Sequence, residues 1–205
     1  MTIPNTRYSR LPTEFDVAGK TVIVTGAARG IGKGIARVFA ESGAQVMVTS
    51  LTDRYLMPLA EEMEAAGHPI FPLTADATDS DDWQRTVDTA LSAWGRIDVL
   101  INNLGDAIRK PLVPPPGSDG TPITDDEWQF VMDINLTEAF KVFPDPETGE
   151  PERIAASRER AKTNVPLGRV GELREVGLLA LYLASDASAY MTGETLYLDG
   201  GLSHS

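Results

Sequence analysis

Three glycines in the stretch "VIVTGAARGIGKGIA" are spaced for holding a pyrophosphate. Gly26, Gly30 and Gly32 follow the pattern G-x-x-x-G-x-G, and residues without side chains let the backbone approach phosphate oxygens closely. An apolar run precedes the loop and a helical pattern follows it, so free N–H groups and a helix dipole would face the anion. A tight turn alone also explains such glycines, but the strand–loop–helix context favours a dinucleotide site.

Residues beside this loop bear on which dinucleotide binds. In such folds an acid at the end of the second strand binds the ribose 2′-hydroxyl, whereas a basic residue accommodates a 2′-phosphate. Here Ser50 stands at that strand end, Arg29 directly precedes Gly30, and Arg54 is close by. An arginine fork suits a phosphate, although Arg29 could be merely solvated and Asp53 could turn back to the ribose. The sequence favours NADP(H) over NAD(H).

The elements that must position these residues alternate between strands and helices. Strands joined by helices of this length are parallel neighbours with right-handed crossovers, and nearly continuous apolar strands are typical of sheets covered on both faces. The sequence therefore predicts an α/β fold, a doubly wound parallel sheet (Rossmann fold), as a single domain over 1–205. The expected strands cover 20–26, 44–50, 68–76 (with prolines near its ends) and 96–103. The expected helices cover 31–43, 56–67, 80–94 (capped by Ser80) and a stretch capped by Thr124.

The bulk composition excludes several classes of partner and site. A net charge of −12 repels phosphates, so we expect no nucleic acid and no anionic membrane as partner. The absence of cysteine excludes disulfides and thiol-based metal sites, and the clustered acids Asp79, Asp81 and Asp82 fit a helix N-terminus better than a metal site. The start of the chain lacks an apolar signal region, so we expect a cytoplasmic protein.

Five stretches resemble the motifs of one protein family. They are "TGAARGIG" (25–32), the pair Asp76–Ala77 after the third strand, "NNLG" (102–105), Asn135 within "DINLTEAF", and the stretch 166–201 that ends in "TLYLDGG". In this order, and over nearly the whole chain, they resemble the short-chain dehydrogenase/reductase family, classical type. The third stretch, "NNLG", departs slightly, because leucine replaces alanine in the family's NNAG motif.

The resemblance implies a NAD(P)-dependent oxidoreductase that transfers hydride between a nicotinamide and a small carbonyl or alcohol substrate. It also implies a homo-oligomer (dimer or tetramer), an adenine contact at Asp76 and a catalytic, helix-borne Asn135. No metal is expected. The expected cofactor-binding residues are Gly26, Arg29, Gly30, Ile31, Gly32, Ser50, Asp76, Ala77, Asn102, Asn103 and Gly105.

The family's proton-transfer residues are not in this chain. The family uses a Ser and a Tyr-x-x-x-Lys pair, because a phenol with a pKa near 10 needs a nearby cation to work at neutral pH. No tyrosine here has a lysine four positions later. Only 30 residues separate Asn135 from Pro166, where the resemblance implies roughly a hundred, including the fifth and sixth strands and a helix between them. The gap in the pattern falls at about 140–143.

Three interpretations remain open. The protein could be a complete reductase whose central segment is missing from this sequence, a catalytically inactive truncated relative that only binds the dinucleotide, or a non-enzymatic scaffold. The intact glycine loop, Asn103 and Asn135 favour the first or the second over the third, and the intact final stretch favours the first. An omitted segment predicts a chain break between Phe140 and Pro144 and an empty slot beside the fourth strand. A genuine minimal fold would instead pair "TLYLD" directly with "DVLIN".

Overall fold

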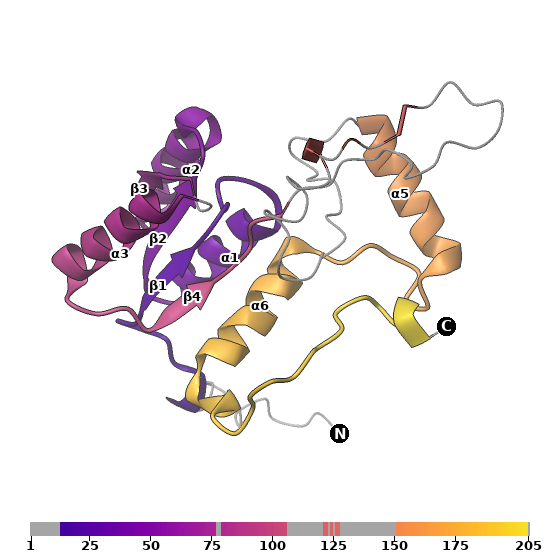
Figure 1. Ribbon diagram of the computed structural model, residues 1–205. Coiled ribbons are helices and arrows are strands. Elements are labelled where there is room, and N and C mark those ends of the chain that lie inside the picture. The colour runs from indigo at the N-terminus through magenta and orange to yellow at the C-terminus, as the bar shows by residue number, and fades with distance from the viewer. Residues whose placement is uncertain are drawn as a thin grey trace.

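The computed structural model describes residues 13–76, 79–105, 121–122, 124, 126–127 and 151–204 (Figure 1). Its centre is a four-stranded sheet with the order β3-β2-β1-β4, in which every pairing is parallel. The predicted doubly wound parallel sheet is therefore confirmed. The strands are β1 (Thr21–Val24), β2 (Gln45–Ser50), β3 (Phe71–Thr74) and β4 (Val99–Ile101).

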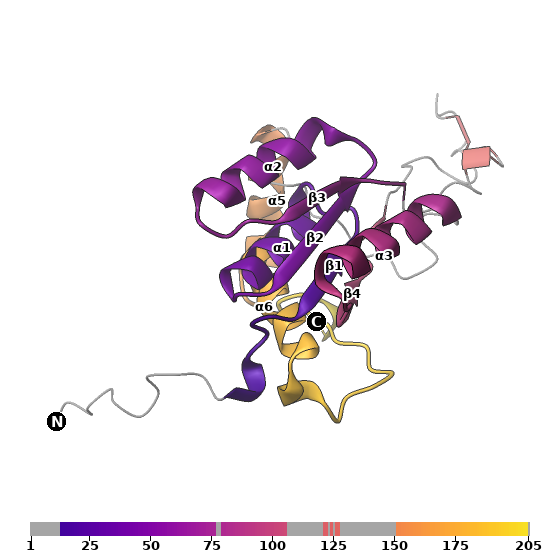
Figure 2. The same cartoon turned by 90° about the vertical axis from the view of Figure 1, so that its left-hand side faces the viewer.

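Helices cover both faces of this sheet. Figures 1 and 2 show α1, α2 and α6 on one face and α3 on the other. Within the described ranges, no helix is both long and apolar enough to cross a membrane. The α-helices are α1 (Gly30–Glu41), α2 (Asp53–Ala65), α3 (Ser80–Trp94), α5 (Pro151–Asn164) and α6 (Leu173–Ala184). Three short 3-10 turns are η1 (Thr13–Phe15), η2 (Asp186–Ser188) and η3 (Leu202–His204).

Alternation along the central strands divides the core in two. Val22 and Val24 of β1 point into the larger cluster, with residues of α1, α2 and α6. Ile23 of β1 and Met47 of β2 point to the other face, where Ala90 of α3 packs on them. Because all four residues of β1 are buried, the strand that precedes the glycine loop is held rigidly from both sides.

Two glycines let α6 pack closely on α1. A Cβ on Gly34 of α1 would lie 2.6 Å from the Leu173 Cβ, and one on Gly177 of α6 would lie 2.7 Å from the Val38 Cγ2. Side chains at these two positions would therefore force α1 and α6 apart. Arg174 adds a polar tie, since its guanidinium donates to the Glu41 carboxylate at 2.6 Å. Helix α6, which lies within the stretch 166–201, thus supports the helix that begins at the glycine loop.

Several predicted boundaries need correction. Ser80 is not the cap of α3; it is the first helical residue, and the Asp79 carboxylate accepts the backbone N–H groups of Asp81 and Asp82 at 2.9 Å. Pro72 lies inside β3 and not at its end. Proline has no backbone N–H to donate to a neighbouring strand. Pro72 is tolerated because β3 is an edge strand with a neighbour on one side only.

The predicted start of a further helix at Thr124 is confirmed by its capping. The Thr124 hydroxyl accepts the Glu127 N–H at 3.2 Å, and the Glu127 carboxylate accepts the Thr124 N–H at 3.0 Å. This reciprocal pair is a capping box. Residues 126–127 are helical, whereas the predicted break between Phe140 and Pro144 lies outside the described residues.

The last predicted strand, 195–199, does not form. Tyr197 and Leu198 are 66% and 47% exposed, and no ladder involves this segment in the described part of the chain. It does not pair with β4, as a minimal fold would require. The physical reason is that a strand needs a neighbour for its backbone hydrogen bonds, and the sequence offers no strand between β4 and this segment. This arrangement differs from the direct pairing of "TLYLD" with "DVLIN" that a genuine minimal fold would show.

The ion pair at the start of α6 predicts an acid-sensitive contribution to stability. The Glu175 carboxylate accepts both Arg169 N–H groups, at 2.7 and 2.8 Å, and the Glu172 N–H at 2.8 Å. Arg169 first, and then this backbone N–H, lower the pKa of Glu175 from its usual 4.5 to about 2. A carboxyl with a depressed folded-state pKa stabilises the fold above its unfolded pKa, and the effect is lost as pH falls toward the folded value.

We therefore expect Glu175→Gln to lower the melting temperature most above pH 5. The difference from wild type should narrow between about pH 4.5 and pH 2, as followed by thermal denaturation across that range. Glu194→Gln is the matched control, because Glu194 is exposed and should give a small difference that does not change with pH. A difference at Glu175 that is independent of pH would contradict this assignment.

Candidate functional site

The glycine loop lies at the carboxyl end of β1, between the ends of β2 and β4. Gly26 and Gly30 have φ values of +59° and +58°, a conformation that residues with side chains rarely adopt. The loop is anchored on both sides, because the Ala27 N–H donates to the Thr49 carbonyl at 3.0 Å and the Thr25 N–H donates to the Ile101 carbonyl at 3.1 Å. The two glycines permit this turn, and the two backbone hydrogen bonds hold it where α1 starts.

Asn103, just after β4, closes over this loop. Its side-chain amide donates to the carbonyls of Thr25 and Gly26 at 3.1 and 3.2 Å, and its backbone N–H donates to the Thr25 hydroxyl at 3.1 Å. A Cβ on Gly32 would lie 2.5 Å from the Asn103 Nδ2 and 2.6 Å from the Ala27 Cα. The first turn of α1 therefore fits against Asn103 only because residue 32 has no side chain.

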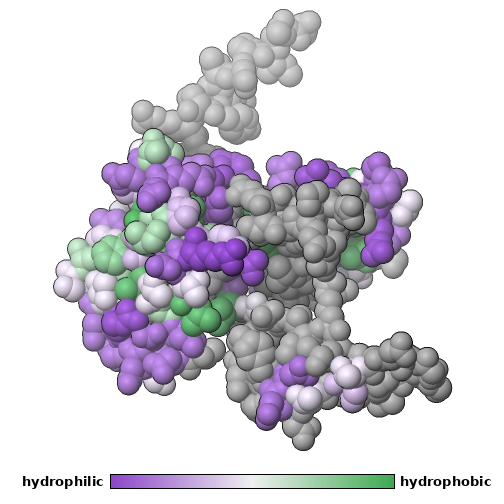
Figure 3. Space-filling view, turned by 90° about the horizontal axis from the view of Figure 1, so that it is seen from above, coloured by the Kyte–Doolittle hydropathy of each residue, from purple (hydrophilic) through white to green (hydrophobic). Residues whose placement is uncertain are grey.

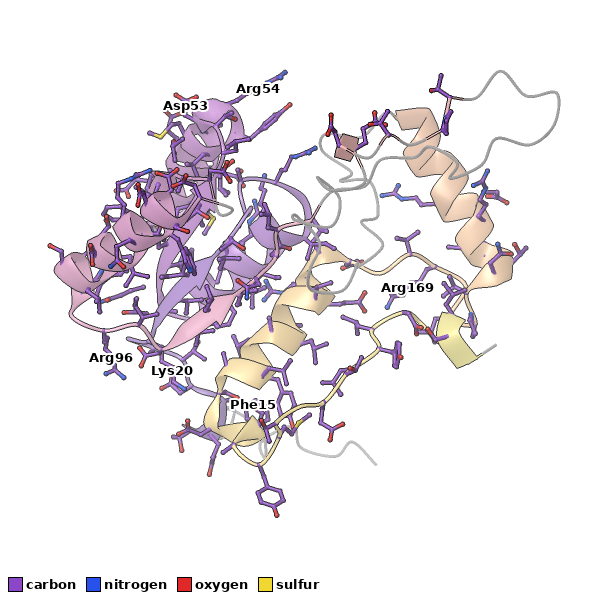
Figure 4. All side chains as sticks on the ribbon, viewed as in Figure 1. Phe15, Lys20, Asp53, Arg54, Arg96 and Arg169 are labelled. Atoms are coloured by element: carbon purple, nitrogen blue, oxygen red, sulfur yellow. The ribbon has the colours of Figure 1, made fainter. Side chains whose placement is uncertain are left out.

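Two arginines gather beside the loop at the start of α2. Arg29 precedes α1 in an extended conformation, and its Cζ lies 6.0 Å from the centre of the Tyr55 ring. The Cζ of Arg54 lies 5.0 Å from the same ring. Ser50 ends β2 and is partly exposed, and Asp53 is exposed in the first turn of α2. Figure 4 shows Asp53 and Arg54 at the opposite end of the molecule from Lys20 and Arg96.

Asp76 is held by the first turn of α3. Its backbone N–H donates to the Asp82 carboxylate at 2.7 Å. This N–H first, and the Arg85 guanidinium second, keep the pKa of Asp82 below its usual value. Asp82 therefore stays ionised at neutral pH and fixes the backbone at the end of β3. Ala75 adds a second hold, because its N–H donates to the Ser50 carbonyl at 2.9 Å.

The remaining predicted residues divide into three groups. Ile31 is partly buried and packs against the larger core cluster, so it anchors the first turn of α1. Asn102 and Gly105 are exposed on either side of Asn103. Ala77 and Asn135 lie outside the residues that the structure describes. Figure 3 shows the molecule from the side of the carboxyl ends of the strands. The described surface there is mostly hydrophilic, with smaller hydrophobic areas between.

Two residues of this region were not predicted from the sequence. Thr25 links β1, β4 and Asn103 through both its backbone and its hydroxyl, which also donates to the Ile101 carbonyl at 3.4 Å. Its position directly before Gly26 is the signal that could have pointed to it. Tyr55 contacts both arginines, and an aromatic residue directly after Arg54 is a weaker signal of the same kind.

Two family models match successive parts of the chain. One is described as short chain dehydrogenase and matches residues 20–144, which is more than half of the chain. The second is described as Enoyl-(Acyl carrier protein) reductase and matches residues 146–203. The two matches meet in the stretch 144–146, next to the predicted gap.

Curated relatives match across the same length. A 3-oxoacyl-[acyl-carrier-protein] reductase from Thermotoga maritima is 27% identical over 248 residues, covering 90% of this chain and 98% of the relative. A glucose 1-dehydrogenase from Gluconobacter oxydans is 27% identical over 265 residues, covering 93% and 94%. Because 90% of a 205-residue chain is only about 185 residues, about 63 of the 248 aligned positions have no residue here.

The solved structures agree on the fold. A short-chain type dehydrogenase/reductase from Mycobacterium marinum superposes with a TM-score of 0.75 at 24% identity, covering 94% of this chain and 99% of the other. The glycine loop and the parallel sheet agree with the family model that matches residues 20–144. This chain belongs to the short-chain dehydrogenase family of oxidoreductases.

Proposed function

We propose that the protein is a NAD(P)-dependent oxidoreductase that acts on a small carbonyl or alcohol substrate. The observation that supports cofactor binding is the tight turn at Gly32, where a Cβ would overlap Asn103 and Ala27. A turn built without room for a side chain, at the N-terminus of a helix, fits a pyrophosphate. When bound, the cofactor exchanges a hydride at its nicotinamide C4 with the carbonyl or alcohol carbon.

In this proposal each part of the site has a separate task. Gly26, Gly30 and Gly32 admit the pyrophosphate, with Ile31 anchoring the helix turn. Asp76 and Ala77 border the adenine, and Asn102, Asn103 and Gly105 border the cofactor where β4 ends. Arg29 and Ser50 face the 2′-phosphate, so NADP(H) is favoured over NAD(H). The Ser50 hydroxyl has no hydrogen-bond partner among the described residues, which suits a group that a ligand would engage.

In this proposal, the residues that transfer the proton of the reaction are not in this chain. We propose that the Ser and Tyr-x-x-x-Lys residues lie in a central segment that relatives carry and that is missing at about 140–143. Asn135 would support a water-linked proton path to them. With this segment the chain forms a single domain that assembles as a homo-oligomer. The reductases and dehydrogenases that match give no support to a chain that only binds the dinucleotide.

The Arg29 assignment predicts a change in cofactor preference. Charge-assisted hydrogen bonds contribute about 1.5–3 kcal/mol, so Arg29→Ala should weaken NADPH binding roughly tenfold or more. NADH binding should change little, because NADH lacks the 2′-phosphate. Fluorescence titration of both nucleotides measures the ratio of dissociation constants.

Arg158→Ala is the matched control for this experiment. Arg158 is exposed on α5 and lies in no salt bridge with another described residue. Its loss should leave both dissociation constants unchanged. If Arg29→Ala keeps the wild-type preference, then Arg29 does not contact the 2′-phosphate.

A further inference from the structure

Tyr55 belongs to the first turn of α2, and two guanidinium groups lie near its ring. Arg54 approaches to 5.0 Å and Arg29 to 6.0 Å from the ring centre, within the range in which a cation is attracted to an aromatic face. Tyr55 is 37% exposed, so part of this residue is accessible to solvent. Residues from two separate elements are thus brought to one ring.

Among the described residues, the two arginines differ from several other cations, which pair with carboxylates. On the neighbouring turns of α1, Lys33 and Arg37 both pair with Glu62 of α2. At the opposite end of the sheet, Arg96 pairs with Asp98. Within the described ranges, neither Arg29 nor Arg54 has a carboxylate at salt-bridge distance. In a chain with a net charge of −12, this is a local cationic site.

Placing two guanidinium groups beside one ring is unfavourable unless something offsets their repulsion. The negative face of the ring offsets part of it and restricts the rotamers of both side chains. An anion that binds between two ordered arginines loses less side-chain entropy than one that must order them. A phosphate monoester carries nearly two negative charges at neutral pH, which matches the two cations.

We propose that Tyr55 is the residue that sets the preference for NADP(H), by holding Arg29 and Arg54 in place for the 2′-phosphate. It is a positioning residue, because it acts through the two arginines. This inference rests on the proposed dinucleotide site and adds the element that orders its cations. It requires the ring and not the hydroxyl, so Tyr55→Phe should preserve the effect.

The test compares dissociation constants of NADPH and NADH for four chains. Tyr55→Leu removes the ring that orders the two arginine side chains, so NADPH binding should weaken about tenfold while NADH binding stays the same. Tyr55→Phe should match wild type. Tyr190→Leu is the matched control, because Tyr190 is fully exposed, and it should also match wild type. Binding of 2′,5′-ADP alone, followed by calorimetry, isolates the adenosine end.

Each outcome decides the proposal. A selective loss in Tyr55→Leu for both NADPH and 2′,5′-ADP, with Tyr55→Phe unaffected, supports it. An unchanged preference in Tyr55→Leu overturns it while leaving the dinucleotide site intact. An equal loss in Tyr55→Phe assigns the effect to the hydroxyl and also overturns it. If wild type binds neither nucleotide, the proposed function fails and this inference fails with it.

Discussion

Replacing Gly32 by alanine should weaken NADPH binding by about a hundredfold while the chain remains folded. The new Cβ would lie 2.5 Å from the Asn103 amide nitrogen and 2.6 Å from the Ala27 Cα. The second contact is with backbone, so no rotamer change relieves it. Overpacking of this kind costs roughly 1–3 kcal/mol. The loop would have to move away from the position that its hydrogen bonds to β2 and β4 define.

The loss cannot come from helix propensity, because alanine is the better helix former at an ordinary helical position. Gly171→Ala is the control for the substitution itself, since a Cβ there would meet only the Glu175 carboxylate at 3.8 Å. Gly34→Ala is the control for clash without contact to the loop, because its Cβ would meet Leu173. It should lower the melting temperature and leave the affinity of the folded chain near wild type.

Fluorescence titration and thermal denaturation of the three variants separate the two effects. Gly32→Ala should mainly weaken NADPH binding and change the melting temperature less. Gly34→Ala should mainly lower the melting temperature and change NADPH binding less. If Gly32→Ala bound NADPH within about threefold of wild type, the first turn of α1 would not be the phosphate cradle.

The local parts of this fold could be read from the sequence because their determinants are local. Continuous apolar runs predicted β1 and β2 to within a few residues, and Gly43 and Gly95 mark the turns that follow α1 and α3. The glycine loop was predictable for the same reason, since positive φ at Gly26 and Gly30 leaves a direct trace in residue type. Thr124 and Glu127 likewise carry their capping box in their spacing.

Contacts between distant segments could not be read in this way. Thr25 and Asn103 meet only because β1 and β4 are neighbours in the sheet, and Tyr55 meets Arg29 only because α1 and α2 both start at one edge. The segment 195–199 shows the same limit, because it was expected to be a strand and does not form one. Its residues have strand character, but a strand forms only where another strand accepts its hydrogen bonds.

A polypeptide of only these 205 residues should bind NADPH and yet turn over no ketone or alcohol. Reduction of a carbonyl needs a proton as well as a hydride, and a positioned acid contributes about 10²- to 10⁴-fold to the rate. The described tyrosines have other surroundings: Tyr182 donates to the Met191 sulfur at 3.2 Å, and Tyr190 is fully exposed. The lysines described in the structure pair with carboxylates, as Lys20–Asp186, Lys33–Glu62 and Lys162–Glu159.

The measurement is NADPH oxidation with a panel of aldehydes and ketones, run beside a binding titration on the same preparation. Binding without turnover is the expected result, and it excludes misfolding as the cause of inactivity. The protein from its natural source should be active and heavier than 22.1 kDa. At the mean residue mass of this chain, the roughly 63 missing positions correspond to about 7 kDa more.

Intact mass and activity together decide between the remaining interpretations. A natural protein of about 29 kDa that reduces carbonyls, beside an inactive 205-residue chain, would place the proton donor in the missing segment. A natural protein of 22.1 kDa without turnover would instead make this chain a dinucleotide-binding protein. Measurable turnover by the 205-residue chain would contradict the prediction, because one of its own residues would then have to supply the proton.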